Sequence, residues 1–201
     1  MTIATYTELK TEVADWAHRS DLTAKMDTFC KLAEAVINKD LRVHEMEEIL
    51  DVTFTDTFYD LPADYLELRA IHIENSGARV PIKSYSPQQL DRLYSRATGT
   101  ANGFAIQGGQ IELRPAPSAT STVDGAITYF TKVDTLTSNP TNDILTAYPM
   151  IYLSAMMIQV YLYLQDDAEL AKWSEAYNSQ IQQANKSSQA GRYNVPQVQA
   201  I

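Results

Sequence analysis

The stretch AYPMIYLSAMMIQVYLYL at residues 147–164 decides how this chain folds, because none of its 18 positions carries a charge. Its length is close to the minimum for a membrane-spanning helix. The flanks argue against a span, since the residues around it are acidic and offer no basic anchor: Asp143, Asp166, Asp167 and Glu169. Four tyrosines, a serine and a glutamine also dilute its hydrophobicity. We therefore expect a helix buried on nearly every face by other elements or subunits.

Apolar residues at helical spacing predict three further long helices around this one. The first covers residues 5–18, with Thr5 or Thr7 as its N-cap. The second covers 22–41 and carries a core stripe: Leu22, Met26, Phe29, Ala33, Ile37 and Leu41. The last covers 167–186 and carries a narrower stripe: Leu170, Trp173, Tyr177, Ile181 and Ala184. The short break at Asp166-Asp167 predicts either an antiparallel helix pair or one long kinked helix.

Between residues 49 and 130 the apolar period shortens, which indicates strands. Gly108-Gly109 separates two alternating runs and predicts a hairpin turn. Ser86 followed by Pro87 predicts the start of a short helix, with serine as the cap and proline at the first position.

These patterns predict an α+β fold, mainly α, in which N- and C-terminal helices pack together around an inserted small antiparallel β region. Residues 1–48 and 135–186 would form the helical body, and residues 49–134 the inserted region. Residues 187–201 are polar with scattered apolar positions and cannot pack a core alone, so we expect a flexible C-terminal tail.

The charge balance disfavours nucleic-acid recognition. The 201 residues include 16 basic and 25 acidic ones, a formal net charge of -9, and no basic patch stands out. The lone Cys30 excludes an internal disulfide and suits a reducing cytoplasm; we interpret it as a core residue.

No catalytic, cofactor or metal site emerges from the sequence. It contains neither a phosphate-binding glycine loop nor a nucleophile elbow. His44 and Glu48 would share a helix face, but the second histidine of a metalloprotease helix is absent. Carboxylate pairs such as Glu12 with Asp15, or Asp64 with Glu67, fit solvated surface better than a glycosidase acid and base. We therefore expect no enzymatic activity.

Tyrosine-rich segments are candidates for protein interfaces. For the four tyrosines of the central helix, an interface and ordinary core packing are equally good interpretations. The tail is the better candidate, because it has no other way to bury its apolar side chains. The expected interface residues are Arg192, Tyr193, Val195, Val198 and Ile201.

Several strings together resemble the head-to-tail adaptor, or neck, proteins of short-tailed phages: INKDLRVHEME at 37–47, LPADYLELR at 61–69, SPQQLDRL at 86–93, IELRPAP at 111–117 and the stretch 140–173. The resemblance covers roughly residues 5–185. It implies a ring of about twelve copies beneath the portal protein, with tail nozzle or tail fibre proteins docking below. It also implies a C-terminal segment that reaches the portal.

The resemblance implies a structural virion protein, made in the host cytoplasm, with no cofactor and no membrane association. DNA would pass through the ring without specific binding. About twelve copies would carry roughly a hundred surplus negative charges, and such a wall repels phosphate. Three alternatives stay open: a virion-associated cell-wall hydrolase, another tail-completion protein and a bacterial regulatory binding module.

Overall fold

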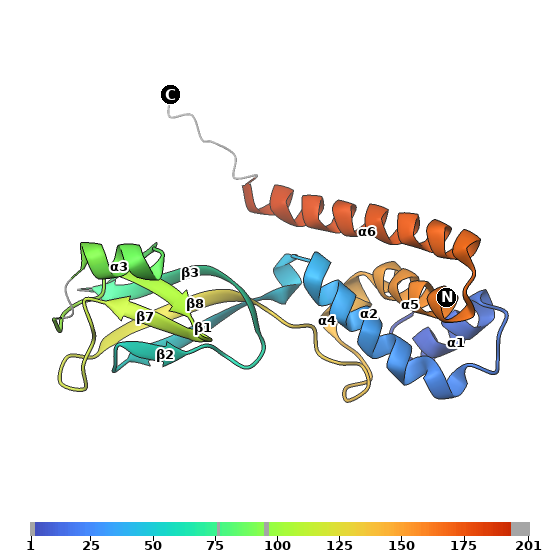
Figure 1. The fold of residues 1–201 in the computed structure, drawn as a ribbon, viewed down its shortest axis with the longest axis horizontal. Helices are drawn as coiled ribbons and strands as arrows, with labels where there is room; N and C mark the ends of the chain where they lie inside the picture. Colours follow the sequence, from blue (N-terminus) through green and yellow to red (C-terminus); the bar gives the residue numbers. More distant parts are fainter. Residues whose placement is uncertain (1–2, 76, 95–96, 194–201) are drawn as a thin grey trace, which may run out of the picture. The chain divides into compact units, whose positions relative to one another are not determined.

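The computed structural model describes residues 3–75, 77–94 and 97–193, with residues 190–193 described by their backbone alone. The chain forms two compact units (Figure 1). A helical unit joins Met1–Met46 to Lys132–Ile201, and a strand unit comprises Glu47–Thr131. The predicted mixed α+β class is confirmed. The unit boundaries fall at 46/47 and 131/132, where the sequence predicts 48/49 and 134/135, because strands begin at Glu47 and end at Thr131.

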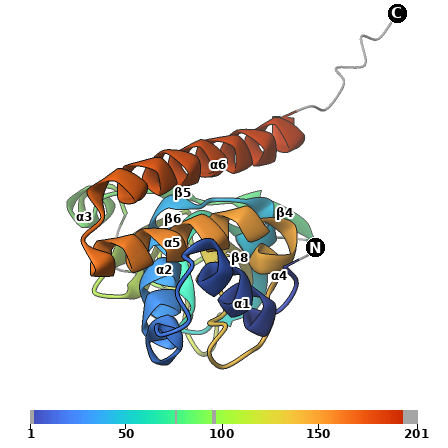
Figure 2. The same cartoon turned by 90° about the vertical axis from the view of Figure 1, so that its right-hand side faces the viewer.

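Helix α5 (Pro149–Leu164) is the centre of the helical unit. It contacts the other long helices and one short one: α1 (Tyr6–Trp16), α2 (Met26–Asp40), α4 (Asp143–Ala147) and α6 (Asp167–Tyr193). Figure 2 shows α5 between α6 on one side and α1 and α2 on the other. Nearly every α5 residue from Ile151 to Tyr161 is buried, which confirms the expectation of a helix enclosed on most faces. None of the helices in the described part of the chain combines the length and the hydrophobicity that a membrane span requires.

The core stripe predicted for the second helix is confirmed. A short 3-10 turn, η1 (Thr23–Lys25), precedes α2, so the α-helix begins later than expected. All six stripe residues are buried: Leu22, Met26, Phe29, Ala33, Ile37 and Leu41. Thr5 caps α1, because its hydroxyl accepts from Glu8 N at 3.3 Å while the Glu8 carboxylate accepts from Thr5 N at 3.0 Å. Residues within each segment therefore determine where α1 begins and which face of α2 is buried.

The break after α5 forms a helix pair and not a kink. Gln165 ends α5 with a left-handed backbone (φ 58°), and α6 then packs back along α5. Helix α6 continues to Tyr193, through residue 187, where the sequence predicts the flexible tail to begin.

Two side chains of α6 explain why the helix continues. Asn185 accepts from Arg42 N at 2.8 Å and donates to Asp40 O at 3.0 Å. The buried Ser188 hydroxyl accepts from His44 N at 3.0 Å. These contacts satisfy backbone groups at the last residue of α2 and just beyond it, so distant parts of the chain stabilise a segment that is too polar to pack alone.

A buried carboxylate fixes the segment that follows the strand unit. Glu34 on α2 accepts from Leu136 N and from the Thr135 hydroxyl, each at 2.7 Å. It also accepts from the Cys30 thiol at 3.6 Å. Asn38, one turn further along α2, accepts from Val133 N at 2.8 Å. Helix α2 thus orders residues 133–136 by side-chain hydrogen bonds.

The strand unit contains two four-stranded sheets, with strand orders β1-β8-β3-β4 and β2-β7-β6-β5. Their bounds are β1 (Glu47–Phe54), β2 (Phe58–Asp60), β3 (Tyr65–Asn75), β4 (Ala78–Pro81), β5 (Lys83–Ser84), β6 (Gly103–Gln107), β7 (Gln110–Arg114) and β8 (Val123–Thr131). One apolar core unites both sheets and includes Phe54, Ile71, Ile111, Leu113 and Ile127.

The predicted hairpin and short helix are confirmed. Gly108 and Gly109 both have positive φ (59° and 82°) between the paired strands β6 and β7. Ser86 caps α3 (Pro87–Leu93), and Pro87 occupies its first turn. The expected antiparallel arrangement holds for the other named strand pairs, but β5 pairs with β6 in parallel. Helix α3 lies between these two strands in the chain and supplies the crossover that a parallel pair requires.

Candidate assembly surfaces

The histidine and carboxylate patterns do not assemble a metal site. His44 lies in a 3-10 turn, η2 (His44–Met46), and Glu48 lies in β1, so the predicted shared helix face is wrong. The turn ends the helical pattern because β1 already begins at Glu47 and pairs with β8. In the described part of the chain, no group of three or more His, Cys, Asp or Glu side chains could hold a metal ion.

Cys30 is a core residue, as predicted. Its side chain is fully buried. Burial and the neighbouring Glu34 carboxylate raise the pKa of the thiol to about 12. Because the thiolate is the reactive form, this cysteine stays protonated and is a poor nucleophile near neutral pH.

The structure separates the two interpretations of the four tyrosines at residues 148–163, of which Tyr148 caps α5 and the others lie within it. Tyr148 donates a hydrogen bond to Glu45 at 3.1 Å, and Tyr152 is buried and accepts from Asn142 at 2.7 Å. Tyr161 is also buried. Tyr163, in contrast, exposes more than half of its surface. Packing therefore accounts for three of the four tyrosines, and one faces outward.

Three exposed apolar side chains lie in the last turns of α1 and α5. Trp16, Leu162 and Tyr163 are each at least half exposed, and we call them the aromatic patch. The Trp16 ring meets the ring of Trp173 on α6 edge-on, with centroids 5.4 Å apart. The Tyr163 ring lies 5.6 Å from that of Phe29 on α2. Exposed aromatic side chains are enriched in protein–protein contacts.

The interface residues predicted in the tail are not placed by the structure. Arg192 and Tyr193 form the end of α6, and their side chains lie outside the described residues. Val195, Val198 and Ile201 also lie outside the described residues. Their role in contacts with other proteins stays a prediction.

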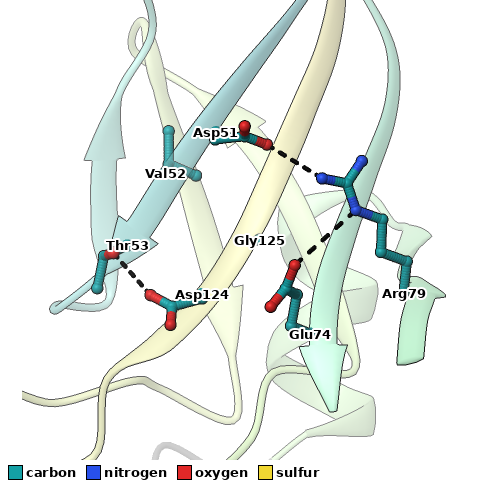
Figure 3. A pocket seen from close by; sticks show the side chains of 7 residues that line it. All are labelled: Asp51, Val52, Thr53, Glu74, Arg79, Asp124 and Gly125. Carbon is teal, nitrogen blue, oxygen red and sulfur yellow. Dashed lines mark hydrogen bonds and ion pairs between the residues drawn. The ribbon is translucent and has the colours of Figure 1, made fainter. Parts of the chain in front are cut away.

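The outer face of the β1-β8-β3-β4 sheet is strongly charged (Figure 3). Arg79 on β4 lies 3.3 Å from Asp51 on β1 and 3.9 Å from Glu74 on β3. Thr53 donates to Asp124 at 2.6 Å beside them. These side chains surround a shallow hollow whose charge is predominantly acidic.

Strands β1 and β4 are the two outer strands of this sheet. Both expose apolar side chains, since Ile49 on β1 is 59% exposed and Val80 on β4 is 41% exposed. All four β4 residues are exposed. The sequence indicates the strands but not their order in the sheet, so it could not identify these two edges.

Comparison with known proteins gives one relationship. No curated protein matches the chain. The family model described as SU10 adaptor protein matches residues 4–200, which include both the helical and the strand unit. The chain therefore belongs to the SU10 adaptor protein family and is a phage adaptor-type structural protein.

Proposed function

We propose that the chain is a non-enzymatic subunit of an adaptor ring that joins the portal vertex of a phage head to the tail, as in short-tailed phages. The ring would contain about twelve copies, matching a rotationally symmetric portal. The family match over residues 4–200 is the observation that carries the proposal. The tail nozzle or tail fibre proteins would dock on the face away from the portal.

The surfaces of the helical unit fit a structural role. The aromatic patch leaves Trp16, Leu162 and Tyr163 exposed, and contact with another protein would remove this apolar area from water. We assign contact with the portal to the end of α6 and the residues that follow it, including Arg192, Tyr193, Val195, Val198 and Ile201. That segment would gain contact area on the portal in exchange for conformational entropy.

The charge of the chain fits a passage for DNA. The formal net charge of -9 is repeated in every copy. A surface of this sign repels the phosphate backbone, whereas tight binding of DNA depends on basic contacts. DNA would therefore move through the ring without being held.

Native mass spectrometry of portal rings mixed with the purified protein tests the proposal. We expect a product heavier than the portal by about twelve subunits. A variant truncated after Gln189 keeps Asn185 and Ser188, and we expect it to fold but to bind portal rings poorly. Glu175→Ala, an exposed change on α6, is the matched control and should bind normally.

An assay of the same purified protein on peptidoglycan distinguishes an adaptor from a virion-associated hydrolase. We expect no turnover of purified peptidoglycan. Peptidoglycan turnover together with failure to bind portal rings would overturn the proposed function.

A further inference from the structure

The β1-β8-β3-β4 sheet ends in two strands that are open on one side. An outer strand presents unpaired backbone N–H and C=O groups, and natural proteins usually shield such edges with prolines, bulges or covering segments. Strand β1 has eight residues without proline, and it pairs with β8 without any shift in register. It is therefore a regular, accessible edge.

The hydrogen-bond pattern shows which β1 residues face the open side. Ile82 N donates to Ile71 O at 3.0 Å, so the polar groups of Ile71 point away from β8. Ile127 on β8 lies opposite Ile71, so its backbone N–H and C=O point away from β3 and toward β1. There Ile127 forms a hydrogen-bonded pair with Leu50, whose backbone groups therefore point toward β8. Backbone groups of successive residues alternate between the two sides of a strand. The β1 residues that direct their backbone groups to the open side are therefore Ile49, Asp51 and Thr53.

The same alternation applies to β4. Val80 is paired with Ile73, whose polar groups point toward β4 like those of Ile71. Val80 therefore faces β3, and Arg79 and Pro81 face the open side. Proline lacks an N–H, so its position at an open edge leaves no donor unpaired.

We propose that neighbouring copies of this chain join edge to edge, with β1 of one copy adding to β4 of the next. The inference rests on the proposed ring. Adjacent strands of this sheet are all antiparallel, so continuing it from β4 into another copy's β1 keeps the alternation. The register of the added pair places Asp51 opposite the neighbour's Arg79.

This register matches the side chains on both faces of the sheet. On the outer face, Asp51 meets a guanidinium, and Ile49 lies opposite a proline. On the inner face, Leu50 lies opposite the neighbour's Val80. Arg79 and Asp51 exchange two backbone hydrogen bonds, and Ile49 N donates a third to Pro81 O. The contact covers Ile49 and Val80, which are 59% and 41% exposed in a single copy.

Charge favours this contact over a two-fold pairing of β1 with itself. Strand β1 carries Glu47, Glu48 and Asp51 and no basic residue, so self-pairing would bring carboxylates together. Strand β4 carries Arg79 and no acid. A contact between two different edges is also the kind that closes a ring, whereas a two-fold contact ends at a dimer.

Complementary charge reversal tests the contact between copies. Asp51→Arg and Arg79→Asp should each reduce the fraction of assembled copies on portal rings about tenfold, because like charges then face each other. An equimolar mixture of the two variants should restore assembly. The ion pair between Asp51 and Arg79 within one copy stays broken in both variants. Restored assembly in the mixture can therefore come only from contacts between copies.

Disulfide trapping provides the second measurement and needs no portal. Leu50→Cys with Val80→Cys in a Cys30→Ala background should form covalent multimers on mild oxidation, since these positions face each other across the added pair. Either single cysteine alone should form few dimers. Dimers from Leu50→Cys alone would indicate β1 self-pairing and overturn the proposal, as would the absence of any covalent multimer.

The two proposals fail in different ways. Portal binding by about twelve copies without rescue or trapping would reject the edge contact and leave the adaptor ring standing. Trapped multimers that never bind portal rings would support the edge contact and reject the adaptor ring.

Discussion

Arg79 Nη2 lies 3.3 Å from Asp51 Oδ1, although the two residues belong to strands at opposite edges of one four-stranded sheet. Both side chains are well exposed, at 56% and 77%. Such a pair contributes about 0–1 kcal/mol to stability, so either residue can be changed without unfolding the sheet. Reversing these charges therefore reports on contacts between copies rather than on folding.

The Glu34 carboxylate orders the segment that leads into α4. Glu34→Ala removes the acceptor of Leu136 N and of the Thr135 hydroxyl, and we expect the free energy of unfolding to fall by about 2–4 kcal/mol in urea titrations. Glu34→Gln keeps a carbonyl acceptor and should lose less. The exposed control Glu175→Ala should change little; equal values for Glu34→Ala and this control would contradict the account.

Gly125 allows the close packing of β8 in the strand unit. A Cβ atom there would lie 2.3 Å from His72 O and 3.1 Å from Phe54 Cε2. Gly125→Ala should therefore destabilise the protein by about 1–3 kcal/mol, measured by thermal unfolding. Gly108→Asn is the control, since its backbone is left-handed with open space around it, and asparagine tolerates that turn. A Gly125→Ala protein as stable as the wild type would show that the sheet has room to adjust.

Alkaline pH should weaken the helical unit through Cys30. The pKa of the buried thiol is about 12, whereas an exposed thiol has a pKa of about 8.5. The unfolded chain therefore releases this proton first, and the stability from the protonated thiol is complete below about pH 8.5 and is lost as pH rises toward 12. Urea midpoints should fall between pH 7.5 and about 9.75, before most tyrosines ionise. Cys30→Ala should flatten that fall; an identical fall would exclude the thiol as its source.

Asn185 and Ser188 should protect specific backbone amides. In hydrogen exchange, Asn185→Ala should speed exchange at Arg42 N–H about tenfold, because its acceptor is lost. Ser188→Ala should do the same at His44 N–H. Gln182→Ala, on the exposed side of α6, should leave both rates unchanged. Uniform changes across the helical unit would point to general destabilisation instead.

Local patterns made much of the fold predictable. The Leu22-to-Leu41 stripe is a property of one helix, and the Gly108-Gly109 turn is set by neighbouring residues with positive φ. The continuation of α6 was not predictable, because Ser188 is held by His44, 144 positions earlier. The parallel β5–β6 pair and the free edges of β1 and β4 also depend on strand order, which no single segment encodes.

The candidate surfaces were likewise predictable from the sequence only in part. The sequence singled out tyrosines by composition, but only their packing shows that Tyr152 is internal and Tyr163 is exposed. Trp16 is the last residue of α1 and stays half exposed, although its ring meets that of Trp173 on α6. Burial of such residues depends on neighbours far away in the chain, so periodicity alone could not assign them.

Cryo-electron microscopy of the neck of purified phage particles tests the central claim most directly. The account predicts a ring of about twelve copies adjoining the portal, into whose density the helical and strand units both fit. A neck fully explained by other proteins, in particles that lack this chain, would contradict it.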